Sequence, residues 1–246
     1  MTDKSLIINI LGNSLALASP KQGLFYRDTY AFRLGRDLGL ENTVVNRARR
    51  NMTVVEQIRD INAEDDIHYI QADYHIVHLG IVDCAPRLFT RGDQRLLGVM
   101  PFRRIIIRFA SKHRFFLTKI FPKVYVRKDV FARKYRDLLE AILQKTPTKK
   151  IFLINLAATK PRNIGRSYGI ERNIQDYNAF IAGIASEIPD RVRLIDLFAM
   201  TQVDPSLVFD DGIHLTAKGH EVLAETISRL ITDNETERGD SDGLSD

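Results

Sequence analysis

The sequence predicts an α/β fold, a three-layer α/β/α sandwich with a central, mainly parallel sheet of five strands. Two observations predict it. Five short apolar runs of the buried-strand type recur along the chain, and a segment with helical periodicity follows each of them. Strands that alternate with helices form parallel sheets that are covered on both faces. At 246 residues the chain is long enough for one such domain, which we place at residues 1–232.

Each predicted strand is a short apolar run that stops at polar or turn-forming residues. The run 5–11, SLIINIL, is followed at once by Gly-Asn-Ser, and the run 42–48 is weaker and ends in polar residues. The other runs cover 73–80, 150–156 and 191–197, and each leads into a loop. Functional residues of such sheets gather at the carboxyl ends of strands, so the residues after each run are the candidates for a site.

The predicted helices lie between these runs and after the last one. They cover 26–39, which ends at a Gly stop, and then 53–61, 134–145, 174–188 and 216–231. In the last helix the apolar residues form one stripe, and Thr216 is suited to cap its N-terminus.

Composition is that of an ordinary globular protein, with 44% hydrophobic and 27% charged residues. No apolar run reaches the length of about 18 residues that a membrane-spanning helix needs. The N-terminus lacks the layout of a secretory signal. The single cysteine, Cys84, excludes an internal disulfide framework and fits a reducing compartment. These features predict a cytoplasmic protein.

The stretch FDDGIHLTAKGH, 209–220, places Asp211 three residues before His214, just ahead of a predicted helix. A carboxylate that accepts the Nδ1 proton of a His fixes its tautomer and leaves Nε2 free to act as a base. The same residue types also form ordinary surface turns. Ser14, two residues after Gly12 at the end of the first strand, is a candidate nucleophile, although a Ser here also suits a helix cap. Together the residues predict the nucleophile, base and orienting acid of acyl transfer.

Four short motifs carry a resemblance to the SGNH (GDSL-like) hydrolase superfamily, from residue 5 to about 231. ILGNS resembles the first block, with Asn13 in place of the usual Asp. VVNRARRNMT resembles the second block, whose usual Gly falls at Asn51. VHLGIVD resembles the third block, but Val82 stands where that block has Asn. DGIHLTAKGH matches the fifth block closely.

The resemblance implies a flavodoxin-like SGNH hydrolase fold and ester hydrolysis by Ser14, with His214 as base and Asp211 as the acid that orients it. It implies no cofactor, and no His/Cys/Glu cluster has metal-ligand spacing. The family's oxyanion hole uses the Ser N–H, the second-block Gly N–H and the third-block Asn side chain. Ser14 keeps the first donor and Asn51 can keep the second, whereas Val82 removes the third. We expect the Asn51 side chain to replace it; Asn13 is a weaker candidate.

Further residues at strand ends are candidates for substrate binding. Arg87 follows Pro86 in a loop and is expected to hold an anionic substrate group, with a structural ion pair as the alternative. Asp83 and Asn155 are the other two candidates. Cys84 is interpreted as a small buried thiol rather than a nucleophile, and His78 as a core residue with a satisfied ring rather than a second base.

Three function classes remain open. The leading one is a serine esterase that removes an O-acetyl or other small acyl group from a carbohydrate or glycan precursor. An O-acyltransferase with the same triad is the second, and a lipase or thioesterase on lipid acyl groups is a related alternative. A degenerate binding module, suggested by the altered second and third blocks, is the third class. The oligomeric state stays open.

Charge is unevenly distributed along the chain. Residues 233–246 hold six acids and one Arg, and we expect this acidic tail to be disordered. The segment 103–136 holds twelve Lys and Arg against Asp129 alone, with aromatic and aliphatic residues interleaved. We expect residues from about 88 to 136 to form a basic, aromatic-rich insertion near the active site.

The anionic partner of this insertion is expected to be a glycan, a lipid-linked phosphate intermediate or a membrane surface, which would make the protein peripheral to the membrane. The alternative is an amphipathic helical pair that is simply solvated on its charged face. No recognised nucleic-acid module is present, and we expect no nucleic-acid partner.

Overall fold

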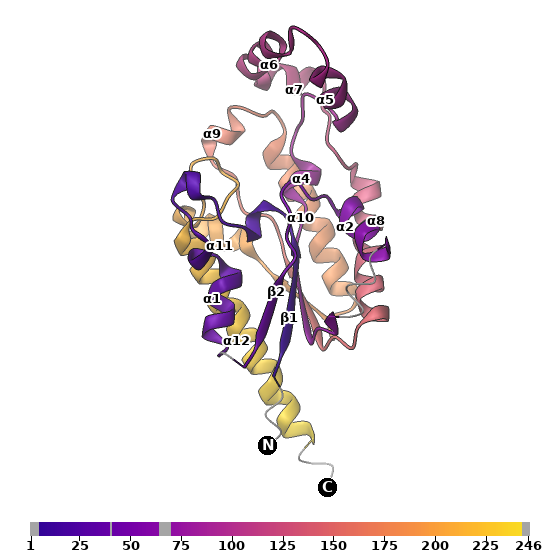
Figure 1. Cartoon of the computed structure of the whole chain (residues 1–246), viewed down its shortest axis with the longest axis vertical. Coiled ribbons are helices and arrows are strands. Elements are labelled where there is room, and N and C mark those ends of the chain that lie inside the picture. The colour runs from indigo at the N-terminus through magenta and orange to yellow at the C-terminus, as the bar shows by residue number, and fades with distance from the viewer. Residues whose placement is uncertain (1–4, 40, 64–69, 243–246) are drawn as a thin grey trace.

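The central sheet has five strands, and every neighbouring pair is parallel. The computed structural model describes residues 5–39, 41–63 and 70–242. The strands are β1 (Ile7–Gly12), β2 (Thr43–Asn46), β3 (Tyr74–His78), β4 (Lys150–Ile154) and β5 (Val192–Ile195). Their order across the sheet is β2-β1-β3-β4-β5, and Figure 1 labels the neighbours β1 and β2. The predicted fold class is confirmed.

This strand order places a reversal of direction beside β1. The chain steps from β1 outward to β2 and then returns to the other side of β1 at β3. Ligand sites of open α/β sheets form at such a switch point, outside the carboxyl ends of the strands. The residues after β1 and β3 are therefore the ones that the topology favours for function.

Two layers of helices cover the sheet (Figure 1). On one face α2 (Val54–Ala63), α8 (Lys128–Lys145) and α10 (Ile170–Glu187) share an apolar cluster with the sheet. On the other face α1 (Tyr30–Asp37) and α12 (Ala217–Asp242) share a second cluster. Burial of these apolar faces, at about 25 cal/mol per Å², is the main force that holds the three layers together.

The connections carry short helices. Three 3-10 turns follow β1: η1 (Ser14–Ala16), η2 (Pro20–Gln22) and η3 (Tyr26–Asp28). After β3 comes α4 (Ile81–Cys84), after β4 comes α9 (Pro161–Ile164), and after β5 come α11 (Leu197–Val203) and η4 (Pro205–Leu207).

The predicted basic insertion is a group of helices between β3 and α8. It contains α5 (Arg91–Gly98), α6 (Arg103–Lys112) and α7 (Arg114–Ile120). Figure 1 shows this group at the end of the molecule farthest from the two termini. The predicted boundary at residue 136 is too late, because α8 begins at Lys128 and buries Phe131 and Tyr135 in the core.

The expectation of a disordered tail from residue 233 is wrong for the described residues. Helix α12 continues to Asp242. Glu235 accepts hydrogen bonds from Lys149 Nζ at 2.7 and 2.8 Å and from the hydroxyl of Tyr74. These bonds join this turn of α12 to the amino ends of β3 and β4. Residues 243–246 lie outside the described residues.

Candidate active site

Ser14 is the first residue of η1 and lies two residues after Gly12, the last residue of β1. A Cβ at Gly12 would lie 3.2 Å from the carbonyl oxygen of His78, so the close approach of β1 to the end of β3 favours Gly. Asn13 caps η1, because its side-chain oxygen accepts the Leu15 N–H at 3.1 Å. Asn can supply this acceptor as well as the Asp of the usual first block. The turn thereby fixes Ser14 at the switch point of the sheet.

A chain of hydrogen bonds joins Ser14 to residues 200 positions away. Ser14 Oγ lies 3.1 Å from His214 Nε2, and His214 Nδ1 lies 2.8 Å from Asp211 Oδ2. All three side chains are only partly buried, so a substrate can reach them. With the proton on Nδ1, Nε2 can accept the Ser14 proton. This is the geometry that nucleophilic acyl transfer requires.

The loop that carries Asp211 and His214 is a tight turn closed by backbone hydrogen bonds. Phe209 N–H donates to the His214 carbonyl at 2.8 Å, and Gly212 N–H donates to the Phe209 carbonyl at 2.9 Å. Gly212 has a φ of +68°, and a Cβ there would lie 2.7 Å from the backbone nitrogen of Lys160. Gly is required at this position because the turn packs directly on the loop after β4.

Asp211 is held as a carboxylate by four donors. Burial raises its pKa, but hydrogen bonds from the His214 ring, the His214 N–H, Gln22 and the Ile213 N–H outweigh burial and hold the pKa well below the ordinary value. Asp211 therefore stays ionised and can stabilise a positively charged His214 ring during the reaction.

Gln22 is a candidate functional residue that sequence reasoning missed. Its Nε2 donates to Asp211 Oδ2 at 2.9 Å, and its Oε1 accepts from Ser19 Oγ at 2.8 Å. No local pattern links position 22 to position 211. The only available signal was that Gln22 lies in the connection that follows the nucleophile.

Two backbone N–H groups predicted to bind the oxyanion lack a hydrogen-bond acceptor in the described part of the chain. The N–H groups of Ser14 and Asn51 have no acceptor among the described residues. Asn51 adopts a φ of +60°, a conformation in which Gly is favoured and Asn is tolerated. Its side chain is exposed. Val82 is 5% exposed within the apolar core cluster, so position 82 provides no side-chain donor. Asn13 uses its oxygen in the cap, and its Nδ2 is buried without a partner.

Asp83 and Asn155, predicted to bind substrate, are buried, and their side chains form hydrogen bonds with neighbouring residues of the fold. Asp83 Oδ1 accepts the Val54 N–H at the start of α2 at 2.9 Å, and burial raises its pKa to about 7. Asn155 donates to Asp196 at 2.7 Å and accepts the Phe198 N–H at 2.9 Å. Neither side chain has an exposed polar group for a ligand, so we assign both a structural role.

The remaining candidates are core residues. Cys84 is fully buried, and burial raises the pKa of its thiol, which keeps it protonated and unreactive. His78 is also fully buried, and burial lowers its pKa to about 3. The expectation of a satisfied His78 ring is wrong, since neither ring nitrogen has a hydrogen-bond partner in the structure. His220 Nδ1 accepts the Tyr30 N–H at 3.1 Å. In the described residues no group of side chains is arranged to hold a metal ion.

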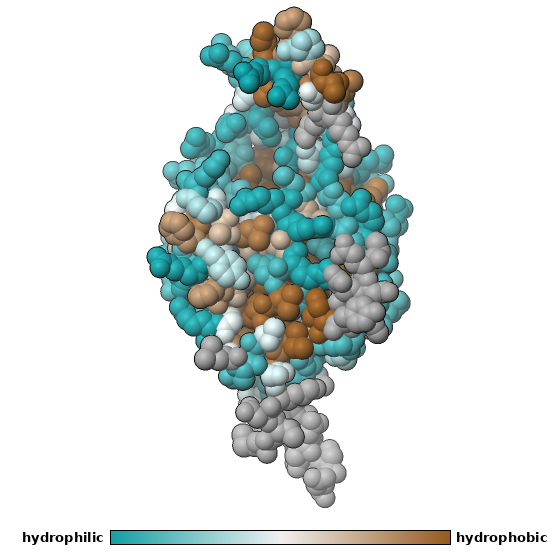
Figure 2. Space-filling view, viewed as in Figure 1, coloured by the Kyte–Doolittle hydropathy of each residue, from teal (hydrophilic) through white to brown (hydrophobic). Residues whose placement is uncertain are grey.

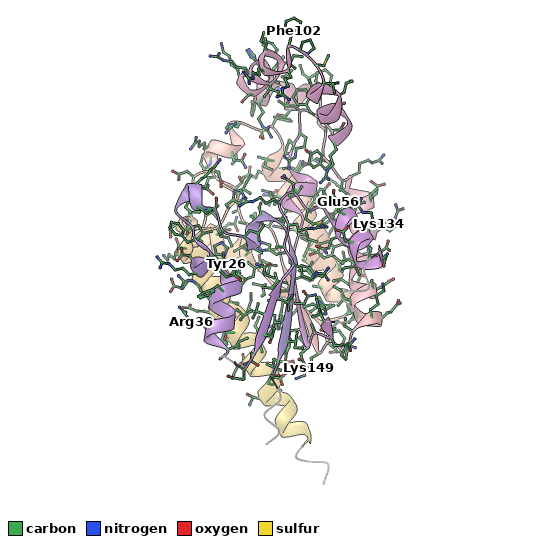
Figure 3. All side chains as sticks on the ribbon, in the orientation of Figure 1. Tyr26, Arg36, Glu56, Phe102, Lys134 and Lys149 are labelled. Atoms are coloured by element: carbon green, nitrogen blue, oxygen red, sulfur yellow. The ribbon has the colours of Figure 1, made fainter. Side chains whose placement is uncertain are left out.

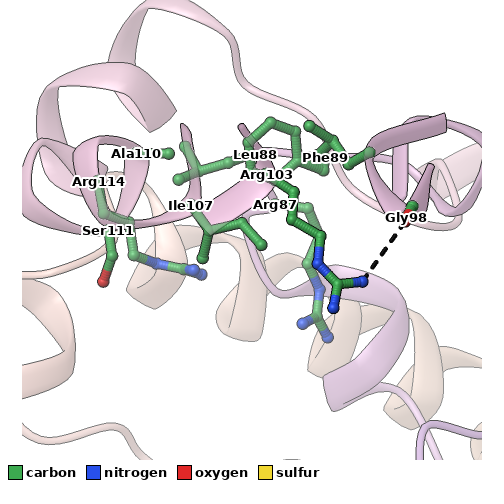
Figure 4. Close-up of a pocket in the computed structure, with 10 residues that line it drawn as sticks. Arg87, Leu88, Phe89, Gly98, Arg103, Ile107, Ala110, Ser111 and Arg114 are labelled. Carbon is green, nitrogen blue, oxygen red and sulfur yellow. Dashed lines mark hydrogen bonds between the residues drawn. The ribbon is translucent and has the colours of Figure 1, made fainter. Parts of the chain in front are cut away.

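Arg87 lies at the edge of the insertion, in a pocket of about 490 Å³ that residues between 87 and 114 line (Figure 4). Arg103 and Arg114 line the same pocket, beside apolar residues that include Leu88, Phe89 and Ile107. None of the three arginines forms an ion pair with a described residue. The structural ion pair considered for Arg87 is thus not formed; its guanidinium stacks on the Tyr125 ring at 4.5 Å. Ser14 and His214 do not line this pocket.

The fold and the site define a class of enzyme, the ester hydrolases built on a parallel sheet with a Ser at the end of the first strand. The chain belongs to the GDSL-like lipase/acylhydrolase family, whose model matches residues 10–222. It is accordingly a carboxylic ester hydrolase of the SGNH type, and the predicted superfamily is confirmed.

Solved structures show the same fold at low sequence identity. A lipase/acylhydrolase from Enterococcus faecalis has a TM-score of 0.63 at 15% identity, covering 92% of this chain and 95% of that chain. A catalytic mutant of an acetylxylan esterase from Geobacillus stearothermophilus has a TM-score of 0.59 at 18% identity, covering 93% and 95%. A GDSL-like lipase structure from Parabacteroides merdae has a TM-score of 0.60 at 15% identity, covering 90% and 93%. No curated protein matches the sequence.

Proposed function

We propose that the protein is a serine esterase that removes an O-acetyl or other small acyl group from a carbohydrate or glycan precursor. The observation that carries this proposal is the hydrogen-bonded chain from Ser14 through His214 to Asp211. The acetylxylan esterase among the similar structures favours a small acyl group on a sugar. A cytoplasmic location remains part of the proposal and rests on the sequence alone.

In this mechanism Ser14 Oγ attacks the ester carbonyl carbon while His214 Nε2 takes its proton. The carbonyl oxygen becomes an oxyanion, for which the N–H groups of Ser14 and Asn51 are the proposed donors. When the intermediate collapses, the alcohol leaves with the proton from His214 and the acyl group stays on Ser14. Water then attacks the acyl-enzyme with His214 as base, which releases the acid and restores Ser14.

The experiment that tests the proposal combines an activated ester with acetylated sugars. We expect a burst of p-nitrophenol from p-nitrophenyl acetate, followed by steady turnover, and release of acetate from an acetylated xylooligosaccharide. Absence of both the burst and the turnover would favour a binding module and contradict the esterase. Faster turnover with a free sugar, together with a newly acylated sugar, would identify an acyltransferase. Preference for long acyl chains or thioesters would identify a lipase or thioesterase.

A further inference from the structure

The group of helices α5 to α7, residues 91–121, concentrates most of the exposed apolar surface of the protein. We call this segment the cap. Of the 17 large apolar side chains that are exposed in the described part of the chain, eleven lie between Leu96 and Phe121. In helix α6 itself only Ala110 is buried. An amphipathic helix whose apolar side stays exposed in the described part of the chain is typical of a helix that an external surface covers.

Helix α6 presents three distinct faces. Phe102, Ile105 and Phe109 lie three and four residues apart and form an apolar stripe, with exposed fractions of 67%, 67% and 61%. Arg104, Arg108 and Lys112, each four residues apart, form a cationic stripe beside it, and all three are exposed. The third face, with Arg103, Ile107 and Ala110, lines the pocket that residues 87–114 form. The first two stripes do not line this pocket.

The charge of this surface has one sign. From Leu96 to Lys128 the sequence contains nine Lys and Arg and no Asp or Glu. Arg104, Arg108 and Lys112 form no ion pair with any described residue. An exposed apolar stripe flanked by unpaired cations is the arrangement of helices that lie in the interface of an anionic membrane.

The cap is held on the side of the body where the active site opens. Arg114 donates to Ser167 Oγ at 2.9 Å and to the Pro86 carbonyl at 2.8 Å, and Thr118 Oγ1 accepts the Tyr168 N–H at 3.0 Å. These contacts join α7 to loops after β3 and before α10. Figure 3 places Phe102 at the outermost point of the molecule, where Figure 2 shows hydrophobic and hydrophilic surface side by side.

We propose that the cap docks on the surface of an anionic phospholipid bilayer, with Phe102, Ile105 and Phe109 in the interface and Arg104, Arg108 and Lys112 against the headgroups. This inference goes beyond the proposed esterase function and does not depend on it. Among the described residues no helix has the length and apolarity to cross a membrane, so the contact would be peripheral. A second copy fits this surface poorly, because two caps face to face would bring like charges together.

Vesicle sedimentation at low ionic strength tests the electrostatic part. We expect the protein to bind vesicles of phosphatidylcholine with phosphatidylglycerol and not those of phosphatidylcholine alone, and to bind less at physiological salt. Each cation near such a surface contributes about fivefold to binding, so Arg104→Gln, Arg108→Gln and Lys112→Gln together should weaken it about 100-fold. The matched control removes the same charge from Arg36, Arg59 and Arg172, which are exposed outside the cap, and should keep most of the binding.

The absence of Trp from the chain allows a direct test of insertion. In Phe102→Trp we expect a blue shift of the emission with anionic vesicles and quenching by brominated phospholipid. Val203→Trp, at an 87% exposed position on α11, should show neither change. The substitutions replace exposed side chains, and an unchanged melting temperature confirms that the variants fold. Turnover of a water-soluble ester should also be unchanged in the cap variants.

Three results would overturn the proposal. One is equal binding to neutral and anionic vesicles, or none to either. Another is an equal loss in the cap triple variant and the control triple variant. The third is that the protein binds no lipid but self-associates as its concentration rises, and that the double variant Phe102→Ser with Phe109→Ser abolishes this self-association. The apolar stripe of the cap would then contact a second copy of the chain. None of these results depends on ester hydrolysis, so they test the membrane proposal without testing the esterase proposal.

Discussion

The side-chain amide of Gln22 donates a hydrogen bond to Asp211 Oδ2, which at the same time accepts from His214 Nδ1. One carboxylate oxygen therefore joins the turn after the nucleophile to the loop that carries the base. The side chain of Gln22 forms its hydrogen bonds with Asp211 and Ser19 and none with Ser14, so its expected role is to position Asp211 and keep it ionised.

Gln22→Leu should lower kcat about tenfold with little change in KM, because one hydrogen bond to a charged group contributes about 1.5 kcal/mol. Loss of this donor also raises the pKa of Asp211 toward its ordinary value, so the acidic limb of the kcat profile should move to higher pH. The pH dependence of kcat measures both effects. Lys21→Leu, on the same 3-10 turn and exposed, is the control and should behave as the parent does.

Ser14→Ala should abolish ester hydrolysis and leave the fold intact. Loss of a triad member costs on the order of 10⁴–10⁶ in kcat, and the burst with p-nitrophenyl acetate should disappear. Thermal unfolding should be nearly unchanged, since Ser14 Oγ bonds only to His214 in the structure. Activity close to that of the parent would contradict the mechanism.

Asn51→Gly keeps the backbone N–H at a φ of +60° and removes only the side-chain amide. If that amide supplies the third oxyanion donor, kcat should fall at least tenfold; the loss of such a donor costs about 2.7–4 kcal/mol, or about 100- to 1000-fold in kcat, in other enzymes. Adding Val82→Asn to Asn51→Gly should restore much of the loss. Full activity of Asn51→Gly would instead mean that the oxyanion is stabilised by backbone N–H groups alone.

Asp83 should make the stability depend on pH. Its pKa is raised from 3.8 to about 7 by burial, so between these values the folded protein binds a proton that the unfolded chain has lost. The contribution of Asp83 to the free energy of unfolding should therefore be largest below this window and fall as pH rises through it, by at most about 1.4 kcal/mol per pH unit.

Asp83→Asn keeps the acceptor for the Val54 N–H but cannot titrate, so this pH dependence should be absent from the variant. Urea unfolding at several values from pH 4 to pH 8 measures it. Asp129→Asn changes an exposed carboxylate and serves as the control. An equal slope in parent and Asp83→Asn would show that another group is responsible.

The secondary structure was predictable because its signal is local. The apolar run before Gly12 reads as a buried strand, and the alternation of such runs with helices predicts a parallel sheet. The tail was mispredicted for the opposite reason. Its composition is that of a disordered segment, but Glu235 finds Lys149 and Tyr74, which are distant in sequence.

The sequence by itself determined the family and the fold class and indicated Ser14, Asp211 and His214 as the candidate triad, because these depend on short motifs and on the order in which they occur. The tertiary structure alone decided which side chains meet. It brought Gln22 to Asp211, buried Asp83 and Asn155, and left the apolar stripe of α6 exposed. Such contacts join residues far apart in the chain, and side-chain burial is settled only when the layers pack, so no local pattern can encode them.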